Sequence, residues 1–338
     1  MGGSFNWIFI LIAGTVILIF FITIVQKQKE ISQIKLAASI RTDISAILTG
    51  AGVTADTTNI LTMPKTEIYF TCDEEGYSDF EIARTGVNKK TSFDVIFAPD
   101  FVKGPTLVTW AKEFKIPFKV MNFLYLTDAQ VRYILVFSPG NQLAEKIEAE
   151  LPDELNRETV SPGANVADKN NYKVKFVFFE GFNQLTAAPF KNMPDKDVSA
   201  IEITSNEIRF YQKKGQYFAL QGAVPYLRDE DDTFIYGAIF SEDRIFYECN
   251  LKKALKRTAA VTKLFADRES EIKTLAGSGC AAYYFGKISE LLSFVEPCSE
   301  NINLCDFGQI SSTAYSPFGI KYNHDETLAY HTECPQIY

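Results

Sequence analysis

Apolar and polar residues are distributed very unevenly along this chain, and the longest apolar run lies at its beginning. Residues 5–25 (FNWIFILIAGTVILIFFITIV) contain no charged side chain, and the first ionisable side chain after them is Lys27. A bilayer core about 30 Å thick requires about 20 apolar residues at 1.5 Å per residue. The run therefore predicts one transmembrane helix over residues 5–26, preceded by a short flank at 1–4.

The helical pattern continues past the apolar run. After Glu30, apolar residues recur mostly three and four positions apart, which is the period of one face of a helix. Neither Gly nor Pro occurs between Phe20 and Thr49, and Gly50 then provides a stop. We therefore expect an amphipathic helical stalk over residues 27–49. Its packing stripe consists of Ile31, Ile34, Ile40, Ile44 and Leu48.

We expect this anchor to be retained. Residues 1–4 carry no Lys or Arg, the apolar run exceeds the 7–15 residues of a signal-peptide core, and IVQK at 24–27 is not a small-x-small cleavage site.

Two observations bear on the orientation of the soluble part relative to the membrane, and they conflict. The basic residues after the span, Lys27, Lys29, Lys35 and Arg41, favour a cytoplasmic soluble part.

Cysteine usage favours the opposite side. The chain has six cysteines and no CxxC pair, a pattern more typical of disulfides in an oxidising compartment than of metal or redox sites. Long domains also cross membranes largely regardless of flanking charge. We therefore expect an extracytoplasmic soluble part, with disulfides among Cys72, Cys249, Cys280, Cys298, Cys305 and Cys334.

The remaining sequence predicts an α+β fold. A β-rich block with one helix (140–152) is expected over 66–152, then a loop or linker over 153–171 and a second β-rich block over 172–248. An αα-hairpin at 249–297 (helices 251–276 and 281–296) and a Cys-containing tail wrapping the surface at 298–338 complete the chain. The expected strands are 67–73, 79–84, 93–99, 107–112, 118–127, 131–139, 172–181, 198–206, 208–212, 216–221 and 234–242.

The geometry of an αα-hairpin predicts one disulfide. In two antiparallel helices, the start of the first lies beside the end of the second. Cys249 precedes the first predicted helix and Cys298 follows the second. We therefore expect a Cys249–Cys298 bond.

Residues that could carry chemistry are few and poorly spaced. The two histidines, His324 and His331, lie seven residues apart near Asp325, Glu326 and Cys334, without the tight pairs of a zinc site. A thiol nucleophile would combine Cys280 or Cys334 with His331. The acidic run 229–232 (DEDD) lacks the spacing of a calcium loop. The strand–Gly–helix junction at 138–140 lacks a phosphate-loop motif.

We therefore predict no catalytic, cofactor-binding or metal-binding residue, and no enzymatic activity. The formal net charge of −8 and a pI near 5.1 also argue against nucleic acid as a partner. The expected partners are the lipid bilayer, through residues 5–26, and either copies of the same chain or another envelope protein, through residues 31–48.

The N-terminal layout resembles that of type IV pilins, whose long helix is buried in the membrane and then in the filament. That resemblance implies contacts between helices of neighbouring subunits. The sequence shows no basic leader, and its fifth residue is Phe5, where pilins usually have Glu. Either a leader has been removed or the chain is not a pilin. The segments GGSFNWIFILIAG and FYECNLKKALKR also resemble uncharacterised single-pass proteins of small-genome archaea, a resemblance that implies no activity.

Two functions fit the sequence. The first is a membrane-anchored structural or interaction protein of the cell surface, as a pilin-like subunit or an envelope assembly factor. The second is a membrane-tethered enzyme or ligand-binding domain with its site near residues 138–140. For the stalk, we slightly favour packing on its own domain over packing between chains, because the pilin leader and Glu are absent.

Overall fold

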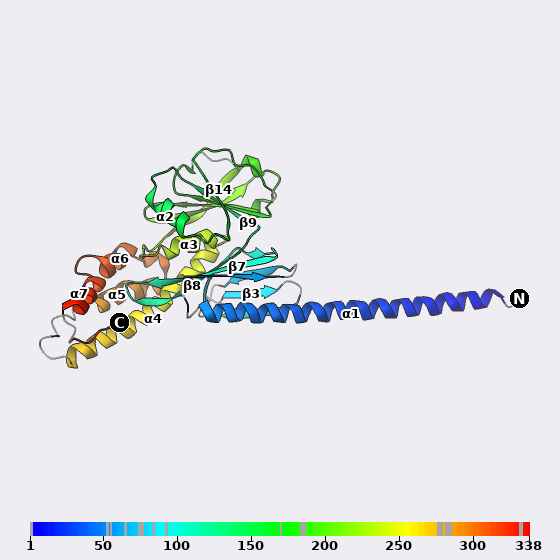
Figure 1. Cartoon of the computed structure of the whole chain (residues 1–338), viewed down its shortest axis with the longest axis horizontal. Coiled ribbons are helices and arrows are strands. Elements are labelled where there is room, and N and C mark those ends of the chain that lie inside the picture. Colours follow the sequence, from blue (N-terminus) through cyan, green and yellow to red (C-terminus); the bar gives the residue numbers. More distant parts are fainter. Residues whose placement is uncertain are drawn as a thin grey trace.

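The computed structural model of the chain has one long helix and a folded body at its end (Figure 1). It describes residues 3–51, 54, 56–63, 66–73, 78–82, 85–91, 94–169, 171–182, 187–275, 280, 286–330 and 334–338. The body combines three β-sheets with six further α-helices among these residues, which confirms the predicted α+β class.

Helix α1 (Gly3–Ala51) is continuous from the apolar run through the predicted stalk. Figure 1 shows its N-terminal part projecting away from the body and its C-terminal part lying along one side of it. Among the described residues, α1 is the one helix long and apolar enough to cross a membrane. At 1.5 Å per residue the helix is about 75 Å long, more than twice the thickness of a bilayer core.

Two small sheets lie next to α1. Sheet 1 has the strand order β1-β7-β8-β5, and sheet 2 has the order β4-β3-β2-β6. The hairpin β7–β8 is the longest pair and is antiparallel, whereas β5 runs parallel to β8. The strands are β1 (Thr57–Thr62), β2 (Ile68–Cys72), β3 (Ser78–Ile82), β4 (Val87–Thr91), β5 (Val95–Phe97), β6 (Phe101–Val102), β7 (Thr106–Lys115) and β8 (Lys119–Asp128).

Sheet 3 is larger and mixed, with the order β10-β9-β11-β12-β13-β14. Its first four strands are parallel to one another, and β13 and β14 complete it as an antiparallel hairpin. Helix α2 (Gln142–Glu150), whose N-cap Asn141 accepts a hydrogen bond from the Ala144 N–H, connects β9 to β10. The strands are β9 (Val131–Val136), β10 (Asn156–Val160), β11 (Lys173–Phe178), β12 (Val198–Ile203), β13 (Glu207–Lys214) and β14 (Tyr217–Pro225).

The expected linker at 153–171 is wrong in part, because β10 lies inside it. This strand pairs with β9 along its whole length. Its short polar sequence, NRETV, gave no strand signal. It is held instead by the buried side chain of Arg132 on β9, which forms an ion pair with Glu158 and donates to the Ala167 carbonyl.

The expected strand at 234–242 is also wrong. The segment forms helix α3 (Thr233–Phe240), and all eight of its residues are buried. Helix α3 contributes to the same apolar core as sheet 1, sheet 3 and helix α4 (Arg244–Leu275). A helix covered on all sides has no polar face, so its sequence reads like that of a buried strand.

The predicted αα-hairpin is present and consists of α4 and α5 (Lys287–Glu300). The tail after it is more structured than a surface wrap, since it forms α6 (Phe307–Tyr315) and α7 (Ile320–Tyr330). Ile310, Ala314 and Ile320 of the tail are buried in the main core. Three short 3₁₀ helices are η2 (Ala188–Phe190), η3 (Asp195–Asp197) and η5 (Ile302–Leu304).

Candidate functional site

The sides of α1 differ in what covers them. Ala37, Ile40 and Ile44 are buried in an apolar core that includes residues of sheets 1 and 2. Ile31 and Ile34 are exposed, at 53% and 43%, and the side chain of Leu48 lies outside the described residues. The predicted stripe is therefore divided. Its C-terminal part is covered by the protein's own body, and its N-terminal part, at Ile31 and Ile34, is exposed among the described residues.

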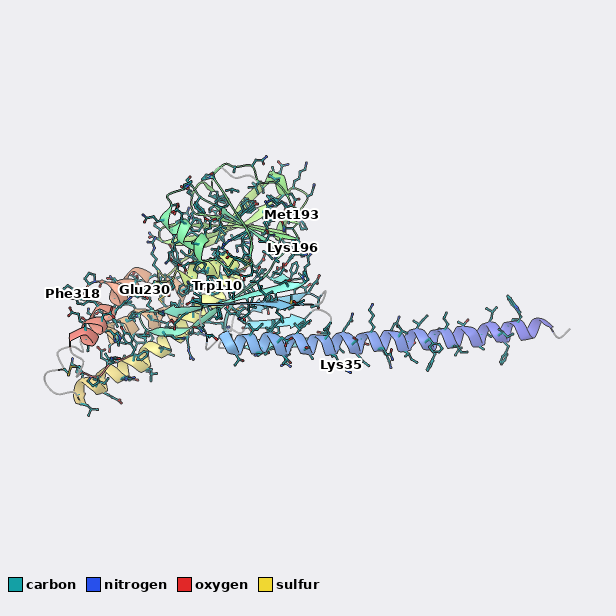
Figure 2. All side chains as sticks on the ribbon, in the orientation of Figure 1. Lys35, Trp110, Met193, Lys196, Glu230 and Phe318 are labelled. Carbon is teal, nitrogen blue, oxygen red and sulfur yellow. A yellow bond between two sulfur atoms is a disulfide. The ribbon has the colours of Figure 1, made fainter. Side chains whose placement is uncertain are left out.

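A groove of about 580 Å³ runs beside the point where α1 meets the body. Leu36 and Ile40 line it from the helix, and Glu67 and Lys103 line it from the segments that precede β2 and follow β6. Figure 2 shows Lys35 at the same level, where the helix leaves the body. This groove lies at the end of the body from which the apolar part of α1 projects.

A second groove, of about 900 Å³, lies between sheet 3 and helix α6. Side chains that donate and accept hydrogen bonds line much of it, among them Asn206, Arg228, Asn303 and Ser312. Arg228 is held by its hydrogen bond to the Ser205 carbonyl. Such a surface is suited to a polar ligand, and these four residues had not been singled out from the sequence.

The backbone N–H groups of the strand–helix junction at 138–140 donate hydrogen bonds to carboxylates of the chain itself. The carboxylate of Glu180 accepts a hydrogen bond from the Ser138 N–H, and that of Glu145 accepts one from the Gly140 N–H at 2.7 Å. The junction lies where the carboxyl ends of β9 and β11 meet, the position at which open α/β sheets bind ligands. Here the backbone N–H groups that would bind a phosphate already donate hydrogen bonds to two side-chain carboxylates.

All six cysteines form disulfides: Cys72–Cys249, Cys280–Cys334 and Cys298–Cys305. The expected Cys249–Cys298 pairing is wrong. Helix α4 begins at Arg244 and is more than twice as long as α5, so the end of α5 lies beside the middle of α4. Cys249, the sixth residue of α4, is about 11 residues, or about 16 Å, from the middle of that helix, and it bonds to Cys72 instead.

The disulfides also exclude the cysteines that were considered as nucleophiles or metal ligands. Because Cys280 and Cys334 are bonded to each other, neither provides a thiolate nucleophile or metal ligand. The ring of His324 stacks on Tyr338 with 3.9 Å between ring centroids, and His331 lies outside the described residues. Within the described residues, no three His, Cys, Asp or Glu side chains are grouped as a metal site.

The acidic run at 229–232 directly precedes α3, with Asp232 at the N-cap position. Asp229 is buried and bonds to Thr233, while Asp232 pairs with Lys146 at 2.6 Å. Glu230 pairs with Lys321 of α7. These carboxylates are therefore used to connect α3 with α2 and α7.

A hydroxyl–amine pair is buried between β3 and α4. The ammonium of Lys253 donates to the Ser78 hydroxyl at 2.8 Å and to the Asp94 carbonyl. Burial lowers the pKa of Lys253 to about 8. Ser and Lys in contact can act as nucleophile and base. Here, however, Ser78 is 3% exposed and lies 3.8 Å from the Cys72 sulfur, so the pair is closed to substrates and holds β3 to α4.

Two further lysines are buried at the start of β11. Lys173 pairs with Glu242 at 2.6 Å and with Asp100, and Lys175 donates to the Ser241 carbonyl just after α3. Burial acts to lower the pKa of Lys173, but the two carboxylates more than offset it and raise the pKa. Burial lowers the pKa of Lys175 to about 8. Sequence reasoning missed both, because alternating Lys in a strand is ordinarily a solvent-facing pattern.

Comparison with protein-family models, curated proteins and solved structures finds no match to this chain.

Proposed function

We propose that the protein is a membrane-anchored structural or interaction protein of the cell surface, with its folded body outside the cytoplasm. The observation that carries this proposal is the continuity of α1 between its apolar run and the body. The helix enters the body through the buried side chains of Ala37, Ile40 and Ile44. The anchor and the body are therefore one rigid unit, and not a domain on a loose tether.

The extracytoplasmic orientation is supported by the disulfides. Three bonds that include all six cysteines are typical of proteins that mature in an oxidising compartment. Basic residues next to the span favour the other orientation, but a long folded domain crosses largely regardless of such charges.

A pilin-like filament subunit is a weaker interpretation than a tethered body. In a filament built through N-terminal helices, neighbouring chains would cover the apolar stripe. Here the distal half of the stripe, at Ile40 and Ile44, is covered by the chain's own sheets.

Protease protection tests the proposal. The full-length protein is expressed in cells, and protease is added outside intact cells or after lysis. The body should be cleaved or shed from intact cells, while the protein stays in carbonate-washed membranes. Val16→Arg should weaken membrane retention, because Arg at the centre of a span costs about 2.5–3.5 kcal/mol. Full protection in intact cells contradicts the orientation, and release of the wild type by carbonate contradicts the anchor.

A further inference from the structure

The uncovered side of α1 carries a heptad pattern of its own. Counting from Ile24, apolar residues fall at positions a and d of successive heptads at Ile24, Ile31, Ile34 and Ala38. Two d positions depart from the pattern, Lys27 before Ile31 and Arg41 after Ala38. Inside the predicted span almost every position is apolar, so the pattern there carries no information. Beyond Lys27 it does, because the neighbouring positions are mostly polar or charged.

This heptad face is distinct from the face that enters the body. At 100° per residue, the centre of Ile31, Ile34 and Ala38 lies about 120° around the helix from the centre of Ala37, Ile40 and Ile44. The first set is exposed and the second is buried. Figure 1 shows the body lying to one side of α1. A helix packed on the heptad face would therefore leave room for both bodies, each pointing outward.

The position of the exposed isoleucines relative to the bilayer also leaves Ile34 available for a partner. Ile31 and Ile34 lie about 9 and 13.5 Å beyond Val25 along the helix. The headgroup region is about 5–8 Å thick on each side. Ile34 is therefore in water, with 43% of its surface exposed. Among the described residues of α1, Ala37 is the first that is buried in the body, so Ile34 is covered neither by lipid nor by the core of the body.

Charge complementarity identifies the partner as a second copy in parallel orientation. Glu30 occupies a g position and Lys35 the following e position, and g-to-e′ contacts join residues i and i+5 of two parallel helices. Among the described residues, neither side chain is in an ion pair. A shared membrane forces two copies into the parallel arrangement that this pairing requires.

We propose that the chain forms a parallel homodimer through Ile31, Ile34 and Ala38 of α1, with Glu30 of each copy facing Lys35 of the other. The inference rests on the proposed membrane anchor. Lys27, at a d position, opposes its own copy, and its ammonium reaches the headgroup phosphates because long basic side chains extend toward the interface. The dimer leaves the groove beside Leu36 open, since Leu36 lies on the opposite side of the helix.

Cysteine cross-linking in native membranes tests the dimer. Ile31→Cys and Ile34→Cys are each introduced into the full-length protein and oxidised in membranes. Both should give a disulfide-linked dimer on a non-reducing gel. Leu36→Cys is the matched control: it is also exposed and apolar, at 45%, but lies about 170° from the heptad face and should give at least tenfold less dimer.

Charge reversal tests the pairing. In the Ile31→Cys background, Glu30→Lys should reduce the dimer yield severalfold, and adding Lys35→Glu should restore it. Equal cross-linking at 31 and 36, or none at 31, overturns the dimer, and so does an unchanged yield in Glu30→Lys. Membrane fractionation of the same samples separates the two proposals. Protein that stays in washed membranes without cross-linking refutes the dimer alone, whereas protein in the soluble fraction refutes the anchor.

Discussion

The buried carboxylate of Asp229 bonds to both the backbone N–H and the hydroxyl of Thr233, at 3.0 and 2.7 Å. Asp229 thereby accepts a hydrogen bond from a backbone N–H at the start of α3, which would otherwise be buried without a partner. Burial, only partly offset by these hydrogen bonds, raises the pKa of Asp229 to about 7 from an ordinary value of 3.8. The folded protein therefore binds a proton at this site more tightly than the unfolded chain does.

This difference predicts the pH dependence of stability. An acid whose pKa is raised on folding contributes stability that is present below about pH 4 and lost as pH rises toward 7. The two pKa values correspond to at most about 4 kcal/mol. Asp229→Asn should flatten the decline in unfolding free energy between pH 4 and 7, measured by chemical denaturation in detergent. Parallel curves for the variant and the wild type would contradict the prediction.

Truncation of the buried part of α1 should loosen the body. Ile44 is 1% exposed, so Ile44→Ala should lower the free energy of unfolding by about 2–5 kcal/mol. Ile245→Ala is a matched control, because Ile245 is also helical but 66% exposed, and its change should stay within about 0.5 kcal/mol. Equal effects would mean that α1 does not pack on the sheets.

The three disulfides should differ in their contribution. Cys72–Cys249 joins residues 177 apart and Cys298–Cys305 joins residues 7 apart. In the chain-entropy account these loops correspond to about 5 and 2.5 kcal/mol. Replacing the first pair by Ser should therefore lower the denaturation midpoint more than replacing the second. Peptide mapping without reductant checks the connectivity directly, and a Cys249–Cys298 peptide would overturn it.

A single methyl group should disturb the packing of α3. A Cβ at Gly237 would lie 2.9 Å from the ring of Phe97, which is fully buried. Gly237→Ala should therefore cost about 1–3 kcal/mol of stability. Gly50→Ala has nothing within 4 Å of its added Cβ and lies in a helix, so it should be neutral or stabilising by up to about 1 kcal/mol. Thermal unfolding of both variants gives the comparison, and a neutral Gly237→Ala would contradict it.

The elements that were predicted well are those with a regular pattern over many residues. Helix α1 has a long apolar run followed by helical spacing, and β7 and β8 have extended apolar and aromatic sequences. The α4–α5 hairpin was predicted because a glycine-rich turn separates two helical patterns. In these segments, local sequence and tertiary packing agree.

The elements that were missed depend on contacts distant in sequence. The sequence of α3, TFIYGAIF, is apolar throughout, because two sheets cover it, and only length separates such a helix from a strand. Strand β10 is polar and is held by Arg132 of its neighbour. Disulfide connectivity likewise follows from where α4 and α5 end, which spacing along the chain did not reveal.

The candidate surfaces were only partly predictable. The stripe on the stalk was visible from helical spacing, but its division between Ile40, which is buried, and Ile31, which is exposed, required the position of the sheets. The buried lysines were not visible, because Lys173 and Lys253 meet their partners across 69 and 175 residues. A charged residue in such a position looks like any surface residue in the sequence.

Between Thr15 and Thr49, α1 contains no Gly or Pro that would allow it to kink, so this part of the helix is stiff. Flexible linkers let an anchored domain tumble, whereas a single helix fixed in the body at Ile40 and Ile44 transmits torque. With α1 inserted in the bilayer as proposed, a sideways pull on the body would tilt the helix, and a change in membrane thickness that tilts the helix would in turn swing the body. Near Phe318, at the far end of the body, a small tilt becomes a displacement of many ångströms (Figure 2).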